Sequence, residues 1–118
     1  MDTLTLKSMS FHALHGYFEE EKEIGNDFEV DLEFALSLLE AAENDDLTKT
    51  IDYSKAREIV TEVMNGPSLH LIETLCFKIG EELFSSFSPQ NLQVKVRKLN
   101  PPMDGETLYS EVCMQWPR

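Results

Sequence analysis

The chain has 118 residues, 42% of them apolar, and its 10 Lys and Arg against 22 Asp and Glu give a net charge of -12. This length and apolar content predict one folded domain over residues 1–118. The acidic charge disfavours nucleic acid and anionic membrane surfaces as partners, because both need a basic surface. No apolar run approaches the roughly 20 residues that span a bilayer. The opening MDTLTLKSMS has no basic segment before an apolar one, so we expect a cytoplasmic protein without a secretory signal.

The first two predicted elements are strands. Residues 3 to 12 are strand-like, but their apolar positions change parity between Leu6 and Met9, which predicts a bulge near Ser8. Residues 28 to 38 alternate apolar and polar side chains without a break and predict a strand about twice the usual length. Its inward-facing side chains are expected to be Phe28, Val30, Leu32, Phe34, Leu36 and Leu38.

Two helices and two further strands follow. Asp52 is expected to cap a helix that ends at Gly66-Pro67, and Ser68 to cap a second helix that ends near SFSPQN. Strands are predicted from Leu92 and from Leu108. The order strand, strand, helix, helix, strand, strand predicts an α+β fold, with helices on one face of a four-stranded antiparallel sheet. Such a sheet has two open edges, which favours a homo-oligomer.

LQVKVRKLNPPMDG, residues 92 to 105, holds an irregularity. Apolar side chains alternate from Leu92 to Val96 onto one face, and the same count places Lys98 on that face, just before two prolines end the strand. A lone lysine there is most often one whose ammonium reaches water at the strand end. The alternative is an acid–base group, since burial eases the loss of its proton.

HALHG, His12 to Gly16, can be interpreted as a metal site or as a structural turn. Residues three apart on a strand point to opposite faces, so His12 and His15 are poorly placed to share an ion, and no third ligand is near. We therefore expect no metal, and a structural histidine that bonds a loop carbonyl, with Gly16 in an unusual backbone angle.

Three further acidic and aromatic features have both an ordinary and a functional interpretation. The Glu19–Glu23 run is by default a solvated charge run. Glu73, near a helix start, is either ordinary helix-end charge or a ligand-binding acid whose two oxygens match paired N–H donors. Tyr53 is by default a half-buried aromatic with a wet hydroxyl. The cysteines, Cys76 and Cys113, are expected to be reduced.

Four segments in order resemble one family. They are FHALHGYFEEEKEIGNDFEVDLEF, TIDYSKA, LIETL and VRKLNPPMDG, between Phe11 and Gly105. Together they resemble the dihydroneopterin aldolase family of folate biosynthesis. The resemblance implies the tunnelling fold, in which four subunits join their sheets into a barrel, two barrels commonly stack into an octamer, and active sites lie between subunits. The last strand, ETLYSEVCMQW, departs from the family pattern.

The resemblance also implies the reaction. It is the retro-aldol cleavage of 7,8-dihydroneopterin into 6-hydroxymethyl-7,8-dihydropterin and glycolaldehyde. The C=N bond of the dihydropterin ring takes the electrons, so no cofactor, metal or lysine Schiff base is needed. By motif, Lys98 resembles the proton-transfer lysine, and Tyr53 resembles the tyrosine that reaches in from a neighbouring subunit to assist protonation of the enol. Glu21 resembles the acid that contacts the substrate side chain, and Glu73 the acid that anchors the pterin. Walls and backbone contacts are expected from Ile51, Leu71 and Ile72.

Two alternatives remain open. One is an epimerase of dihydroneopterin or its triphosphate on the same fold. A triphosphate substrate would favour a basic pocket rim, and the net charge of -12 opposes that. Epimerisation of dihydroneopterin itself is a plausible side activity, because the two bound products of the aldol cleavage can recombine on the other face. The second is a non-catalytic pterin- or purine-binding module that uses the Glu73 anchor alone. Such a module has no need of Lys98 and Tyr53.

Overall fold

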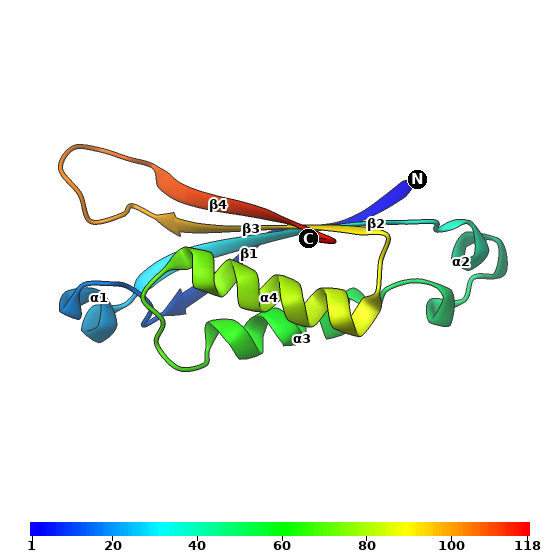
Figure 1. Ribbon diagram of the computed structural model, residues 1–118, viewed down its shortest axis with the longest axis horizontal. Helices are drawn as coiled ribbons and strands as arrows, with labels where there is room; N and C mark the ends of the chain where they lie inside the picture. The colour runs from blue at the N-terminus through cyan, green and yellow to red at the C-terminus, as the bar shows by residue number, and fades with distance from the viewer.

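The computed structural model describes residues 1–118 and contains one sheet of four antiparallel strands. In sheet order they are β1 (Asp2–Ala13), β2 (Asn26–Leu36), β3 (Asn91–Leu99) and β4 (Tyr109–Trp116). The sheet is elongated, and helices cover only one of its faces (Figure 1). The expected α+β architecture is therefore confirmed, with β1 and β4 as the two open edges.

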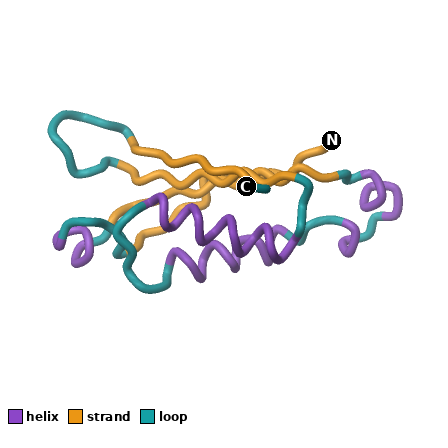
Figure 2. The backbone as a smooth tube through the Cα atoms, viewed as in Figure 1, coloured by secondary structure: helices purple, strands orange, loops and turns teal.

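Two long helices make the second layer (Figure 2). They are α3 (Tyr53–Met64) and α4 (Ile72–Phe87). Two short helices that periodicity did not predict lie at opposite ends of the molecule, α1 (Glu19–Ile24) and α2 (Leu39–Asn44), the latter followed by the 3-10 turn η1 (Leu47–Lys49) (Figure 1). No helix combines the length and the apolar character needed to cross a bilayer.

The core lies between the sheet and the long helices. The alternation predicted for β2 is confirmed, since its inward residues from Phe28 to Phe34 are at most 1% exposed. The expected helix stripes also point inward, with Ala56, Val60 and Met64 fully buried on α3. Burying these side chains drives the two layers together, at about 25 cal/mol per Å² of apolar surface. Both cysteines are unbridged, as expected, and burial raises the pKa of Cys76 to about 12.

The bulge expected near Ser8 is present. The β1–β2 register shifts between Leu6 and Met9, and Ser8 adopts a positive φ of 54°. The Ser8 backbone N–H, freed from the ladder, donates to Asp31 Oδ1 at 2.7 Å. A carboxylate on the next strand therefore satisfies the donor that the bulge leaves unpaired.

Several predicted boundaries were right and others wrong. Asp52 caps α3 by accepting from Ser54 N at 3.0 Å. Ser68 does not cap α4, because its hydroxyl donates to the carbonyl of Leu14 and the helix begins only after Leu71. Leu38 and Leu108 were placed in strands but lie outside β2 and β4. Residues 41–50, for which no helix was predicted, contain most of α2 and all of η1.

The face of the sheet that no helix covers carries an ion-pair cluster. Arg97 donates to both oxygens of Asp31 at 2.8 Å, to Glu29 at 3.0 Å and to Glu111 at 2.9 Å. Arg97 and Asp31 are thereby buried, at 8% and 6% exposure, without helices above them. The Arg97 guanidinium holds the pKa of Asp31 below its usual range.

Candidate active site

Lys98 lies on the helix-covered face of β3, at the end nearest α1. The register pairs it with Phe28 on β2 and Ser110 on β4. Its side chain is only 14% exposed, and its Nζ donates to Glu21 Oε2 at 2.7 Å. The position predicted by alternation is confirmed, and the ammonium is held by a carboxylate rather than released into water.

Glu21 is the one acid of the Glu19–Glu23 run that points inward. It is 6% exposed and lies in α1. Its Oε1 accepts from the backbone N–H of Phe18 at 3.2 Å, and its Oε2 accepts from Asn26 Nδ2 at 2.9 Å. Burial raises the pKa of this carboxyl, but hydrogen bonds from Lys98, Phe18 and Asn26 outweigh burial and hold the pKa below its usual value. Glu21 is therefore an anion poised beside the Lys98 ammonium.

Gly16 is needed beneath Glu21. Its backbone φ is not among the positive ones, so the unusual angle expected there is wrong. The reason for glycine is close approach, because a Cβ at this position would lie 2.6 Å from Glu21 Cδ. Any larger residue would push the carboxylate away from Lys98.

His15 is structural, as expected. It is 2% exposed, its Nε2 lies 2.7 Å from the carbonyl of Met64, and its Nδ1 accepts from the backbone N–H of Leu69 at 3.0 Å. That acceptor role puts the proton on Nε2, which donates to Met64. Gly16 N also donates to the Leu69 carbonyl at 2.9 Å. The loop between α3 and α4 is therefore fixed against the end of β1.

This fixed loop brings the start of α4 to the Lys98–Glu21 pair. A pocket of about 440 Å³ opens there, lined by five of the predicted site residues, Glu21, Leu71, Ile72, Glu73 and Lys98. Glu73 is exposed in the first turn of α4, where the helix dipole favours its anion. One cavity is therefore lined by both an exposed acid and a shielded ion pair. This combination suits a ligand with N–H donors at one end and hydroxyls at the other.

Tyr53 and Ile51 are the two predicted residues that do not line this pocket. They lie where α3 begins, shortly after η1, whereas the pocket is formed by α1, the start of α4 and the β3–β4 region. Tyr53 is 59% exposed, whereas the Ile51 side chain is 3% exposed and belongs to the core. Within one chain, the tyrosine and Lys98 are therefore not brought together.

Other residues of the pocket were not expected from the sequence. Tyr17 and His70 form one wall, with ring centroids 6.0 Å apart, and Ser110 contributes from β4. Ser110 could have been found by pairing the strand that carries Lys98 with the next strand in a hairpin. Tyr17 and His70 lie in irregular segments, for which periodicity gives no direction. No group of three or more His, Cys, Asp or Glu side chains is arranged to hold a metal ion.

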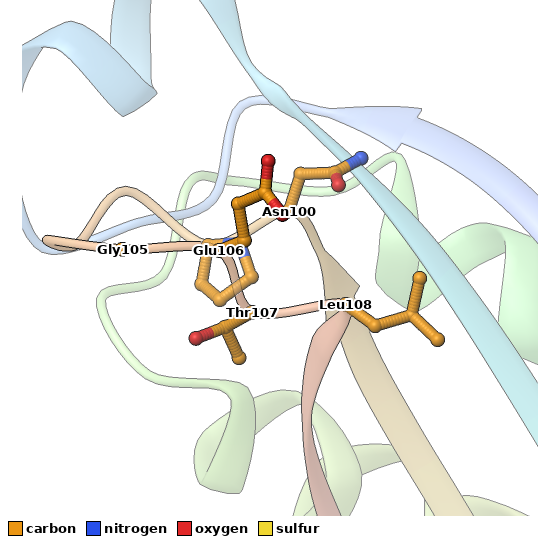
Figure 3. Close-up of a pocket in the computed structure, with 6 residues that line it drawn as sticks. Asn100, Gly105, Glu106, Thr107 and Leu108 are labelled. Atoms are coloured by element: carbon orange, nitrogen blue, oxygen red, sulfur yellow. The ribbon is translucent and has the colours of Figure 1, made fainter.

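A second hollow lies within the β3–β4 connection (Figure 3). It has a volume of about 450 Å³ and is lined by Asn100, Pro101 and residues 105–108. Glu106 is its only titratable group, and Asn100 N donates to the Leu108 carbonyl across the loop base at 2.9 Å. Without a paired acid and base, this hollow offers no comparable chemistry.

The chain was compared with known proteins. Residues 4–115 match the family model described as dihydroneopterin aldolase. The dihydroneopterin aldolase of Bacillus subtilis is 35% identical over 116 residues, covering 98% of this chain and 95% of that protein. The dihydroneopterin aldolase of Streptococcus pyogenes serotype M6 is 39% identical, covering 89% of each.

The fold is also shared with solved structures. The crystal structure of E. coli dihydroneopterin aldolase in complex with neopterin superposes with a TM-score of 0.89 at 22% identity, covering 98% of each chain. Dihydroneopterin aldolase from Burkholderia thailendensis bound to guanine gives a TM-score of 0.72 at 19% identity, covering 96% of this chain and 89% of the other. The family match over nearly the whole sequence is decisive, and this chain belongs to the dihydroneopterin aldolase family.

Proposed function

We propose that this protein cleaves 7,8-dihydroneopterin into 6-hydroxymethyl-7,8-dihydropterin and glycolaldehyde, as a step of folate biosynthesis. The observation that carries the proposal is that Glu73 and the Lys98–Glu21 pair line one pocket. Members of the same family with 35% and 39% identity over most of the chain bear the name of this activity. A binding module would need the Glu73 anchor alone, so the part-buried Lys98–Glu21 pair favours an enzyme.

Glu73 is proposed to hold the pterin ring. Its two carboxylate oxygens match the amino group and the adjacent ring N–H of the pterin, which together form a two-pronged donor. Leu71, the last residue of the fixed loop, and Ile72, the first residue of α4, precede it and line the same pocket, where they would cover the ring. This orientation points the hydroxylated side chain of the substrate towards Lys98 and Glu21.

The proposed chemistry is a proton relay around one carbon–carbon bond. Lys98 first releases one proton to water, and the neutral amine then takes the proton of the 2′-hydroxyl. The bond between C1′ and C2′ breaks, glycolaldehyde forms from C2′ and C3′, and the electron pair moves through C6 onto ring N5. C1′ of the resulting enol then accepts a proton, assisted by Tyr53. No net oxidation or reduction occurs, so the ring's own C=N bond serves as the electron sink.

The site is proposed to be completed by a second copy of the chain. Tyr53 begins α3, is 59% exposed and does not line the pocket, so its role requires another subunit. The open edges β1 and β4 provide main-chain groups through which neighbouring sheets could join. We infer a homo-oligomer, a tetrameric barrel or an octamer of two stacked barrels, with the active sites between subunits.

Incubation with 7,8-dihydroneopterin in the presence of a chelator tests the proposal directly. Glycolaldehyde and 6-hydroxymethyl-7,8-dihydropterin should form in equal amounts. Absence of product at every enzyme concentration would overturn the aldolase function. Activity that returns only when metal is added would overturn the proposed metal-free mechanism while leaving the reaction in place.

A further inference from the structure

Ser110 is a polar residue of the pocket to which the proposed chemistry gives no role. It is the second residue of β4, it is half-buried, and it lines the same cavity as Lys98 and Glu73. It stands directly opposite Lys98 in the β3–β4 register. Directly opposed residues share a face of the sheet, with Cβ atoms about 5 Å apart, so both side chains project to the pocket side.

The hydroxyl of Ser110 has no partner within the chain, in contrast to its polar neighbours. Lys98 Nζ is bonded to Glu21, and Glu111 Oε1 accepts from Arg97 at 2.9 Å. On the sheet wall of the pocket, Ser110 is therefore the polar side chain with its full hydrogen-bonding capacity available, one donor and two acceptor sites.

The position of this hydroxyl is fixed by the backbone. Ser110 lies in a paired strand, and the hydrogen bond from Asn100 N to the Leu108 carbonyl closes the loop just before it. Groups that stand on a strand are held more rigidly than groups on a loop. A hydroxyl held rigidly on the strand residue opposite the proton-transfer lysine can distinguish between the two configurations of a small polyol chain.

We propose that Ser110 binds the terminal 3′-hydroxyl of the substrate side chain and so sets the preference between epimers at C2′. This inference rests on the proposed function. With the 2′-hydroxyl held at Lys98, the direction in which C3′ leaves C2′ depends on the configuration of C2′. Only one epimer can then present its 3′-hydroxyl to Ser110, while the other leaves the serine unpaired.

The test is the ratio of kcat/KM for 7,8-dihydroneopterin and its 2′-epimer. One neutral hydrogen bond corresponds to about fivefold in affinity, so the wild type should discriminate between the epimers and Ser110→Ala should lower that discrimination about fivefold. Ser110→Thr, which keeps the hydroxyl, should retain the wild-type ratio. The Kd for 6-hydroxymethyl-7,8-dihydropterin, which lacks the 3′-hydroxyl, should be unchanged in Ser110→Ala.

Ser10→Ala is the matched control, because Ser10 is an exposed serine on β1, the opposite edge strand. It should behave as the wild type throughout. A wild type without epimer preference, a Ser110→Ala variant with an unchanged ratio, or an equal loss of affinity for the product would each overturn the role of Ser110. Absence of turnover of either epimer by the wild type would instead overturn the proposed function, and this inference with it.

Discussion

Lys98 Nζ lies 2.7 Å from Glu21 Oε2, although the two residues are 77 positions apart in the chain. This bond joins the end of β3 to α1 and fixes the lysine at the pocket wall. Asn26 and the backbone of Phe18 hold the carboxylate from its other sides. The Glu21 carboxylate therefore positions the lysine, and it is itself held by two further hydrogen bonds.

Replacing Glu21 with Gln should lower kcat strongly while leaving the fold intact. The neutral amide keeps the shape but removes the charge that holds the Lys98 ammonium, and a displacement of about 1 Å in an active site can cost about 100-fold in rate. Steady-state kinetics should show this loss. Glu19→Gln, an exposed acid on the same helix, is the control and should have wild-type kinetics. A Glu21→Gln variant with wild-type kcat would show that the ion pair is only structural.

The position of Lys98 could be predicted because a strand repeats every two residues, and the count from Leu92 reached it correctly. The bulge at Ser8 was predictable for the same reason. The short helices α1 and α2 were not, since six residues give fewer than two turns of periodic signal. The burial of Arg97 was not predicted either, because alternation assigns a side chain to a face of the sheet and cannot show that charges on adjacent strands shield one another.

Tyr53 should act across a subunit boundary. Tyr53→Ala and Lys98→Ala are each expected to lose activity by 100-fold or more, roughly the contribution of a proton-transfer group. Co-expressed in one cell, they should form mixed oligomers in which about a quarter of the sites receive both native residues from different subunits. Activity of the purified mixed assembly would measure this. Mixtures as inactive as the separate variants would contradict a site shared between subunits.

Asp31→Asn should destabilise the protein. Removing one partner of a buried ion pair costs about 3–5 kcal/mol, and the Asp31 side chain is 9% exposed beside Arg97. Asp27→Asn is the matched control, because Asp27 bonds His12 on the surface at 2.8 Å with 69% of its side chain exposed, and should cost less than about 1 kcal/mol. Urea unfolding of both variants would compare these losses of free energy.

The Asp31 contribution should also depend on pH. Its pKa in the folded protein is lowered, so the stabilisation is complete above the unfolded value of about 3.9 and is lost as the pH falls through the folded pKa. The difference in unfolding free energy between wild type and Asp31→Asn should be constant from pH 7 to about 5 and shrink below about 4. A difference that grows towards low pH would contradict this assignment.

The site itself was predictable only in part. The chemistry of Lys98, Glu21 and Glu73 came from short motifs, and the structure brings all three to one pocket. Their approach depends on His15, whose two hydrogen bonds fix the loop before α4. The sequence predicted a structural histidine but not the contact it makes, because a hydrogen bond between residues 49 positions apart follows from the complete fold.

The division of labour between Lys98 and Glu73 is the central claim, and Lys98→Ala tests it most directly. Glycolaldehyde release from 7,8-dihydroneopterin should fall to background, while the Kd for 6-hydroxymethyl-7,8-dihydropterin, measured on the same sample, should stay within about tenfold of wild type because Glu73 still holds the ring. Lys98→Arg, which keeps the cation but transfers protons poorly, should be nearly as inactive. Wild-type turnover by Lys98→Ala, or loss of product binding together with activity, would contradict the account.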